Sequence, residues 1–191
     1  FSEISSGGFA VAHNGNLTNG LTLRRELIRD GAIYQSTSDT EVVLHLVARS
    51  RKQRIVERFI EAIRQLEGAY SLVALTNKKL IGARDPLGIR PLVLGELDGK
   101  YILASETVAL DIIGARFVRD IQNGEVVVIS DEGIESLRPF PQQPARPDAI
   151  DEAADRQLAQ RVAPRERRQQ QPHLPERQPE LAPDRRIRDG Q

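Results

Sequence analysis

The sequence predicts an α+β domain in which two antiparallel sheets pack together, with helices outside each sheet. A strand is followed by three helices and then by many short strands, and this segregated order is typical of α+β folds. Several of these strands are apolar on both faces, so both faces need cover. The sequence has no glycine-rich phosphate loop and no dinucleotide-binding fingerprint, which disfavours a doubly wound parallel sheet.

The first predicted strand covers residues 8–12, after a predicted loop at residues 1–8. It leads into Asn14-Gly15, and such a pair at a strand end indicates a tight turn because both residues tolerate positive φ. In a second interpretation, the Asn14 side-chain amide and the Gly15 backbone N–H both point into a site. Two such donors would form an oxyanion hole for acyl transfer. The local sequence leaves both interpretations open.

Three amphipathic helices are expected next. The first covers residues 21–28, and Gly31 is placed to end it in the left-handed conformation. The second begins where Ser38 and Glu41 have the spacing of a capping box. The third, at residues 55–66, has the clearest helical spacing of apolar residues.

Asp39 lies in the first turn of the second predicted helix. The simplest interpretation is that the helix dipole stabilises its carboxylate there. The alternative is a functional carboxylate that receives the ammonium group of a substrate. The helical pattern by itself favours the first interpretation.

A series of short strands completes the predicted domain. The strands are predicted at residues 69–76, 80–83, 91–95, 101–105, 115–119, 125–130 and 133–137, with a short helix at 108–113. The charged loop at residues 84–92 contains three residues that fix its path: Pro86, Gly88 and Pro91. Its charged side chains can form charge-assisted hydrogen bonds within the loop, which favours bracing of the sheet over a role in binding.

Composition excludes several classes of function. The 27 basic and 27 acidic residues balance, so no general electrostatic attraction to nucleic acid or to an anionic membrane is expected. The chain has no cysteine, hence no disulfide, no thiolate zinc site and no cysteine nucleophile of its own. Its three histidines do not have metal-ligand spacing, so we expect no cofactor in this chain. No signal peptide and no apolar run of about 18 residues is present.

Six motifs occur in an order that resembles one enzyme family. They are AHNGNLTN at 12–19, TSDTEV at 37–42, GAYSLV at 68–73, RDPLGIRPLVLG at 84–95, ASET at 104–107 and ALDIIGA at 109–115. Over about residues 1–147 the chain resembles the N-terminal glutaminase domain of the amidophosphoribosyltransferases (glutamine phosphoribosylpyrophosphate amidotransferases). The resemblance implies an N-terminal nucleophile hydrolase fold, a four-layer αββα sandwich.

The resemblance also implies an activity. In this family an N-terminal cysteine attacks the side-chain amide of glutamine and releases ammonia. A second domain uses the ammonia to convert phosphoribosyl pyrophosphate to 5-phosphoribosylamine in de novo purine synthesis. Asn14 and Gly15 match the family's oxyanion hole, and Asp39 matches the carboxylate that binds the α-amino group of glutamine.

The departures from the family concern both ends of the chain. The family's nucleophilic cysteine and the arginine that holds the glutamine carboxylate belong upstream of Phe1. We therefore expect a sandwich truncated at its N-terminus and no glutaminase activity from this chain alone. The domain is expected at residues 1–137, a proline-rich linker at 138–147 and a low-complexity, disordered tail at 148–191.

The resemblance implies partners and cofactors for the parent enzyme. The implied partners are glutamine and phosphoribosyl pyrophosphate, the second bound by the missing domain. The implied cofactor is Mg in that missing part, and the presence of an iron–sulfur cluster there is left open. It further implies a homo-oligomeric, cytoplasmic enzyme. Two alternatives stay open: a non-catalytic module that binds glutamine or a partner, and another class II amidotransferase, which would differ in its ammonia acceptor.

Overall fold

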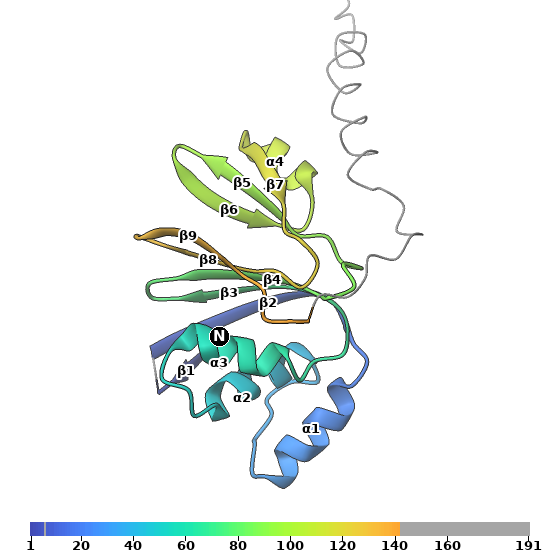
Figure 1. The fold of residues 1–191 in the computed structure, drawn as a ribbon. Helices are drawn as coiled ribbons and strands as arrows, with labels where there is room; N and C mark the ends of the chain where they lie inside the picture. Colours follow the sequence, from blue (N-terminus) through green and yellow to red (C-terminus); the bar gives the residue numbers. More distant parts are fainter. Residues whose placement is uncertain (6, 142–191) are drawn as a thin grey trace, which may run out of the picture. The chain divides into compact units, whose positions relative to one another are not determined.

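The computed structural model describes residues 1–5 and 7–141, which lie in one compact unit. These residues form four layers: helices α1–α3, a six-stranded sheet, a three-stranded sheet and helix α4 (Figure 1). The elements are β1 (Ser2–Ile4), β2 (Gly7–Leu17), α1 (Gly20–Arg29), α2 (Thr40–Arg49), α3 (Ile55–Ile63), β3 (Gly68–Thr76), β4 (Leu80–Arg84), β5 (Val93–Leu97), β6 (Lys100–Ala104), α4 (Thr107–Ile113), β7 (Arg116–Asp120), β8 (Val126–Ser130) and β9 (Gly133–Leu137). The predicted αββα sandwich is confirmed.

In both sheets, every pair of neighbouring strands among the described residues is antiparallel. The larger has the order β1-β2-β3-β4-β8-β9 and the smaller the order β6-β5-β7. The longest pairing joins β2 to β3, from Phe9 opposite Thr76 to Leu17 opposite Gly68. This long ribbon carries two of the three predicted site residues, Asn14 and Gly15, near the end of β2.

Alternation along the strands sends side chains into two different cores. On β3, Tyr70 and Leu72 are fully buried against the helical layer, where they join Phe59 of α3. Val73 faces the other way and packs with Leu94 in the core between the two sheets. The prediction of strands covered on both faces is therefore confirmed for the centre of β3.

A third apolar cluster joins the smaller sheet to α4. Val93 of β5 and Leu110 of α4 are buried in this cluster. A Cβ atom added to Gly95 would lie 2.5 Å from the Leu110 side chain. The glycine therefore lets α4 approach the sheet closely.

Two local predictions at the N-terminus are wrong. Residues 2–4 form strand β1 on the edge of β2 and are not part of an entry loop. Asn14-Gly15 does not turn the chain, because β2 continues to Leu17 and pairs Asn14 with Ser71 and Gly15 with Tyr70. Asn-Gly only permits a turn, and here the long β3 strand supplies partners along the whole of β2.

The capping box at Ser38 and Glu41 is also wrong. Helix α2 begins at Thr40 after the N-cap residue Asp39, whose side chain makes no capping bond. The Ser38 hydroxyl accepts the Thr40 N–H at 3.2 Å, not the N–H of Glu41 that a capping box requires. The Glu41 carboxylate accepts hydrogen bonds from residues 35 and 36, so it is not available to the backbone N–H of Ser38. The donors of the preceding loop thus bind the Glu41 carboxylate in place of the backbone N–H that the capping-box spacing predicted.

Other local predictions are confirmed. Gly31 has φ +92° directly after the end of α1, and its N–H bonds to the Ile28 carbonyl. Asp98 and Gly99 both have positive φ and join β5 to β6 in a hairpin. The linker at residues 138–147 stays a prediction; Pro139, near its start, accepts two hydrogen bonds from the Arg64 guanidinium. The predicted tail at residues 148–191 lies outside the described residues.

Candidate functional site

A cavity of about 520 Å³ opens beside the end of β2. Its walls come from β2, from α1, from the loop before α2 and from α2 itself. Lining residues include Gly15, Leu17, Arg24, Thr37, Ser38 and Asp39. Two of the three residues predicted to bind glutamine, Gly15 and Asp39, thus line one cavity.

The Asp39 carboxylate is anchored to β2 and not to its own helix. Its Oδ2 accepts a hydrogen bond from the Leu17 N–H at 3.2 Å, and its Oδ1 lies 3.4 Å from Nδ1 of His13. It makes no capping bond to α2, although Asp39 is the N-cap residue. A carboxylate offers about four lone-pair positions, so capacity for a cationic ligand remains. Its side chain is 30% exposed, which leaves it accessible from the cavity.

Gly15 is held where no other residue fits. Its φ is +143°, and a Cβ atom at this position would lie 2.0 Å from the Ala69 carbonyl oxygen. A side chain there would force β2 away from β3, because such a contact is far inside van der Waals distance. The strand can therefore present its backbone to the cavity at this point without a side chain in the way.

Asn14 lies on the other side of β2. Phe9 and Val11 pack into the core under the helices, and alternation puts His13 on that face and Asn14 on the opposite one. Asn14 is exposed and does not line the cavity that Gly15 and Asp39 share. The structure therefore joins Gly15 to Asp39 but does not bring the Asn14 side chain into the same cavity. The roles of all three residues stay predictions.

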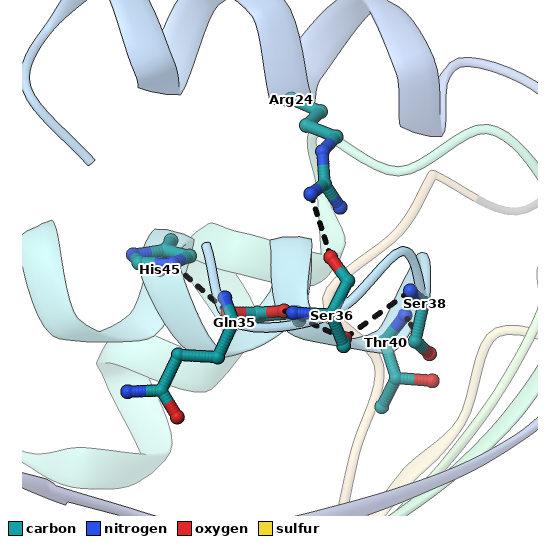
Figure 2. Close-up of polar contacts among 7 residues, drawn as sticks. Arg24, Gln35, Ser36, Ser38, Thr40 and His45 are labelled. Carbon is teal, nitrogen blue, oxygen red and sulfur yellow. Dashed lines mark hydrogen bonds and ion pairs between the residues drawn. The ribbon is translucent and has the colours of Figure 1, made fainter. Parts of the chain in front are cut away.

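The loop that leads to Asp39 is braced by two helices (Figure 2). From α2, the Glu41 carboxylate accepts hydrogen bonds from the backbone N–H groups of Gln35 and Ser36 at 2.7 and 2.8 Å and from the Ser36 hydroxyl at 2.7 Å. From α1, the Arg24 guanidinium donates to the Ser36 carbonyl at 2.6 Å and stacks over the Tyr34 ring. Sequence reasoning missed this brace, because the five-residue spacing of Ser36 and Glu41 matches no standard capping pattern.

The pKa of Glu41 reflects the same contacts. Burial raises the pKa of this carboxyl, but the hydrogen bonds from Gln35 and Ser36 lower it, with a further contribution from nearby His45. The net pKa lies below the usual value, so Glu41 is ionised near neutral pH and holds the loop as an anion. Asp39 thus follows a loop with little freedom to move.

His13 was also missed as a site residue. The sequence showed only a histidine without a metal-ligand pattern, whereas in the structure its side chain is 2% exposed and faces Asp39. Its position directly before Asn14 was the available signal. Asn19, two residues beyond β2, also has an unpredicted role: its side chain bonds the Gln65 carbonyl and the Glu67 N–H, which fixes the end of β2 to the start of β3.

The charged loop at residues 84–92 braces the sheet, as predicted. Asp85 is fully buried, and its carboxylate accepts bonds from the N–H groups of Leu87, Ile89 and Arg90 at 2.9, 3.2 and 3.0 Å. The Arg84 guanidinium donates to the carbonyls of Gly88, Arg90 and Ile121. These contacts point inward, toward the loop itself.

The described residues contain neither a cluster of metal ligands nor a membrane-spanning helix. Within residues 1–5 and 7–141, no three side chains of His, Asp or Glu lie close enough together to hold a metal ion. No helix in the same part of the chain has both the length and the apolar character needed to cross a bilayer.

Comparison with known families decides the assignment. A family model described as "Glutamine amidotransferase domain" matches residues 1–111, more than half of the chain. The chain belongs to the glutamine amidotransferase domain family. The match covers every residue of the candidate site, from His13 to Glu41, so the resemblance stated from six motifs is confirmed.

Curated relatives of this glutamine amidotransferase domain are named amidophosphoribosyltransferase. The protein from Rhizobium etli is 63% identical over 151 residues, which cover 76% of this chain and 30% of the relative. A Staphylococcus aureus protein is 50% identical over 135 residues, covering 70% of this chain and 27% of the relative. The chain thus spans less than a third of the length of the curated relatives that it matches.

Solved structures agree with this family. Glutamine phosphoribosylpyrophosphate amidotransferase from B. subtilis, solved with ADP and GMP, is 40% identical with a TM-score of 0.71, covering 73% of this chain and 31% of that one. A structure described as the allosteric regulatory enzyme of purine biosynthesis gives 40% identity and a TM-score of 0.69, covering 71% and 29%. A structure described as a glutamine aminotransferase class-II domain protein from Silicibacter pomeroyi shares the fold alone. It is 16% identical with a TM-score of 0.51, covering 70% of this chain and 67% of that one.

Proposed function

We propose that this domain binds glutamine and releases its amide nitrogen as ammonia for an amidophosphoribosyltransferase reaction. In that reaction ammonia displaces pyrophosphate from phosphoribosyl pyrophosphate and gives 5-phosphoribosylamine, a step of de novo purine synthesis. One observation carries the proposal: Gly15 and Asp39, which match the family's oxyanion hole and α-amino ligand, line the same cavity. The names of the curated relatives support the choice of phosphoribosyl pyrophosphate as the second substrate.

In this proposal each residue performs a separate task. The Asp39 carboxylate, held by Leu17 and His13, receives the α-ammonium group of glutamine. The Gly15 N–H donates to the oxygen that becomes negative when the amide carbonyl is attacked. Asn14 matches the family's second donor, but its side chain lies on the face of β2 away from the cavity, so its role in the oxyanion hole rests on the sequence match alone. The attacking thiolate comes from outside these residues, because residues 1–191 contain no cysteine.

The absence of a cysteine also favours a second candidate function. A domain with an ammonium-binding carboxylate and no nucleophile of its own could bind glutamine, or a partner, without cleaving it. Glutamine hydrolysis by the protein in its full native length separates the two candidates, because a binding module releases no ammonia. A different class II amidotransferase would hydrolyse glutamine without phosphoribosyl pyrophosphate as its acceptor.

The remaining properties of the parent enzyme are also proposals. They rest on the family resemblance and on the names of the relatives. They comprise Mg held outside this chain, a homo-oligomeric assembly and a cytoplasmic location, with the presence of an iron–sulfur cluster left open. Nucleic acid and membranes are not among the proposed partners.

The main test is Asp39→Asn in the full-length protein. With glutamine as nitrogen source, loss of the carboxylate charge should raise KM at least about tenfold, because an amide does not attract an ammonium ion. With ammonia as nitrogen source, phosphoribosylamine formation should stay at the wild-type rate. The control is Asp111→Asn, on the exposed side of α4, which should change neither activity. An unchanged KM for glutamine in Asp39→Asn would contradict the proposal.

A further inference from the structure

His13 is the buried polar side chain nearest to the proposed ammonium ligand. It lies on β2, on the face that packs under the helices, and its side chain is only 2% exposed. Its Nδ1 is 3.4 Å from Oδ1 of Asp39, whereas its Nε2 is buried and has no hydrogen-bond partner among the described residues. The Asp39 carboxylate is therefore the one polar group that the described structure places against this imidazole.

This contact determines which ring nitrogen carries the proton. An ionised carboxylate can only accept hydrogen bonds, so the nitrogen that faces it must carry a hydrogen. A neutral His13 is consequently the Nδ1–H tautomer, with the lone pair on Nε2. Nε2 itself is buried and has no hydrogen-bond partner among the described residues, so no second contact competes for the orientation of the ring.

The two oxygens of Asp39 are thus held separately. The Leu17 N–H binds Oδ2, and the His13 ring faces Oδ1. Both groups come from β2, although the carboxylate itself lies at the start of α2. Two contacts on different oxygens fix the plane of the carboxylate, whereas the Leu17 bond alone would leave it free to rotate about its terminal torsion.

We propose that His13 is a positioning residue that orients the Asp39 carboxylate toward the α-ammonium group of glutamine. The inference rests on the proposed function and extends it to a residue that does not line the cavity. His13 acts through Asp39 and does not touch the reacting atoms. Its loss should weaken glutamine binding without slowing the chemical step.

The experiment compares two variants of the full-length protein by glutamine-dependent kinetics. His13→Leu removes the donor and keeps most of the side-chain volume, and we expect KM for glutamine to rise about tenfold with kcat within twofold of wild type. His13→Asn places an amide N–H near the position of Nδ1, and we expect KM within about threefold of wild type. A purely structural role would not predict rescue by asparagine. Equal KM values for wild type and His13→Leu would overturn the inference.

A double-mutant cycle tests whether His13 acts through Asp39. The double variant His13→Leu with Asp39→Asn should show the same KM as Asp39→Asn alone, because the group to be positioned is already altered. Additive effects would overturn the inference. Wild-type protein that hydrolyses no glutamine would reject the proposed function together with this inference, whereas active wild type with a normal His13→Leu variant would reject the inference only.

A measurement on wild type covers the case in which His13→Leu does not fold. The ¹⁵N chemical shifts of the imidazole distinguish the two neutral tautomers and the imidazolium. We expect the Nδ1–H tautomer in the folded protein. The opposite tautomer would overturn the inference.

Discussion

Two aspartates in irregular segments, Asp39 and Asp85, show how a bracing carboxylate differs from a carboxylate in a binding site. Asp85 is fully buried, and three backbone N–H groups donate to its carboxylate. Asp39 is 30% exposed and receives one backbone N–H and one imidazole contact. Of these two aspartates, only Asp39 lines the cavity beside the end of β2.

The difference lies in how much of each carboxylate is already used. A carboxylate surrounded by its own loop has no accessible position left for a ligand. Its hydrogen bonds therefore stabilise the conformation of that loop. A carboxylate held by two contacts at the rim of a cavity keeps lone pairs for a cation and is already oriented to receive it. Charge and local sequence do not separate the two cases, whereas hydrogen-bond partners and exposure do.

The largest effect on stability is expected at the brace. Asp85→Ala leaves three backbone N–H groups without their acceptor inside the protein, and we expect the free energy of unfolding to fall by about 3–5 kcal/mol. Urea denaturation of the purified protein measures it. Asp111→Ala, an exposed substitution on α4, is the control and should change stability by less than about 0.5 kcal/mol. A loss at Asp85→Ala as small as that of the control would show that Asp85 is no brace.

An intermediate effect is expected from acid titration of Glu125, which is 1% exposed. Burial raises the pKa of this carboxyl, but hydrogen bonds from Arg119, Ser136 and the Gln122 N–H outweigh burial and leave the pKa below the usual value of 4.5. Because the folded pKa is depressed, Glu125 contributes stability above pH 4.5, and this contribution is lost as pH falls through the folded pKa.

The measurement for Glu125 is the urea midpoint as a function of pH. Glu125→Gln should lower stability at pH 7 and should flatten its dependence on pH below 4.5. Glu135→Gln, at an exposed position on β9, should leave both the midpoint and the slope unchanged. Parallel pH curves for wild type and Glu125→Gln would show that this group does not titrate as the structure indicates.

The smallest effect on stability is expected at the site. Asp39→Asn keeps an acceptor oxygen for the Leu17 N–H, so we expect unfolding free energy to change by less than about 1 kcal/mol. The same substitution is expected to have the largest effect on glutamine use. Thermal unfolding of wild type and variant checks the first part. A loss as large as that of Asp85→Ala would make Asp39 a second brace and would remove the contrast between the two loops.

The sequence predicted the layers well because they depend on apolar periodicity. The burial of Tyr70 and Leu72 on one face of β3 and of Val73 on the other follows from alternation alone. The turns at Gly31 and Asp98-Gly99 were predictable because few other residues accept positive φ. Such features depend only on residues that are close together in the sequence.

Features that depend on distant partners were not predictable from local patterns. Gly15 looked like a turn residue because nothing near it reveals that β3 continues alongside it as far as Gly68. Glu41 looked like a capping acid because the competing donors at residues 35 and 36 belong to an irregular loop. The pairing of His13 with Asp39 joins residues 26 positions apart, and only the fold brings them together. The family resemblance, not periodicity, singled out Asn14, Gly15 and Asp39.

The crowding of Gly15 against the Ala69 carbonyl also bears on how homologous sequences are to be interpreted. A position where any Cβ would lie 2.0 Å from a backbone oxygen is closed to substitution for purely steric reasons. Invariance of glycine in an alignment would therefore say nothing about catalysis. Asn14 is exposed and meets no such obstacle, so its retention across distant members would indicate selection for chemistry.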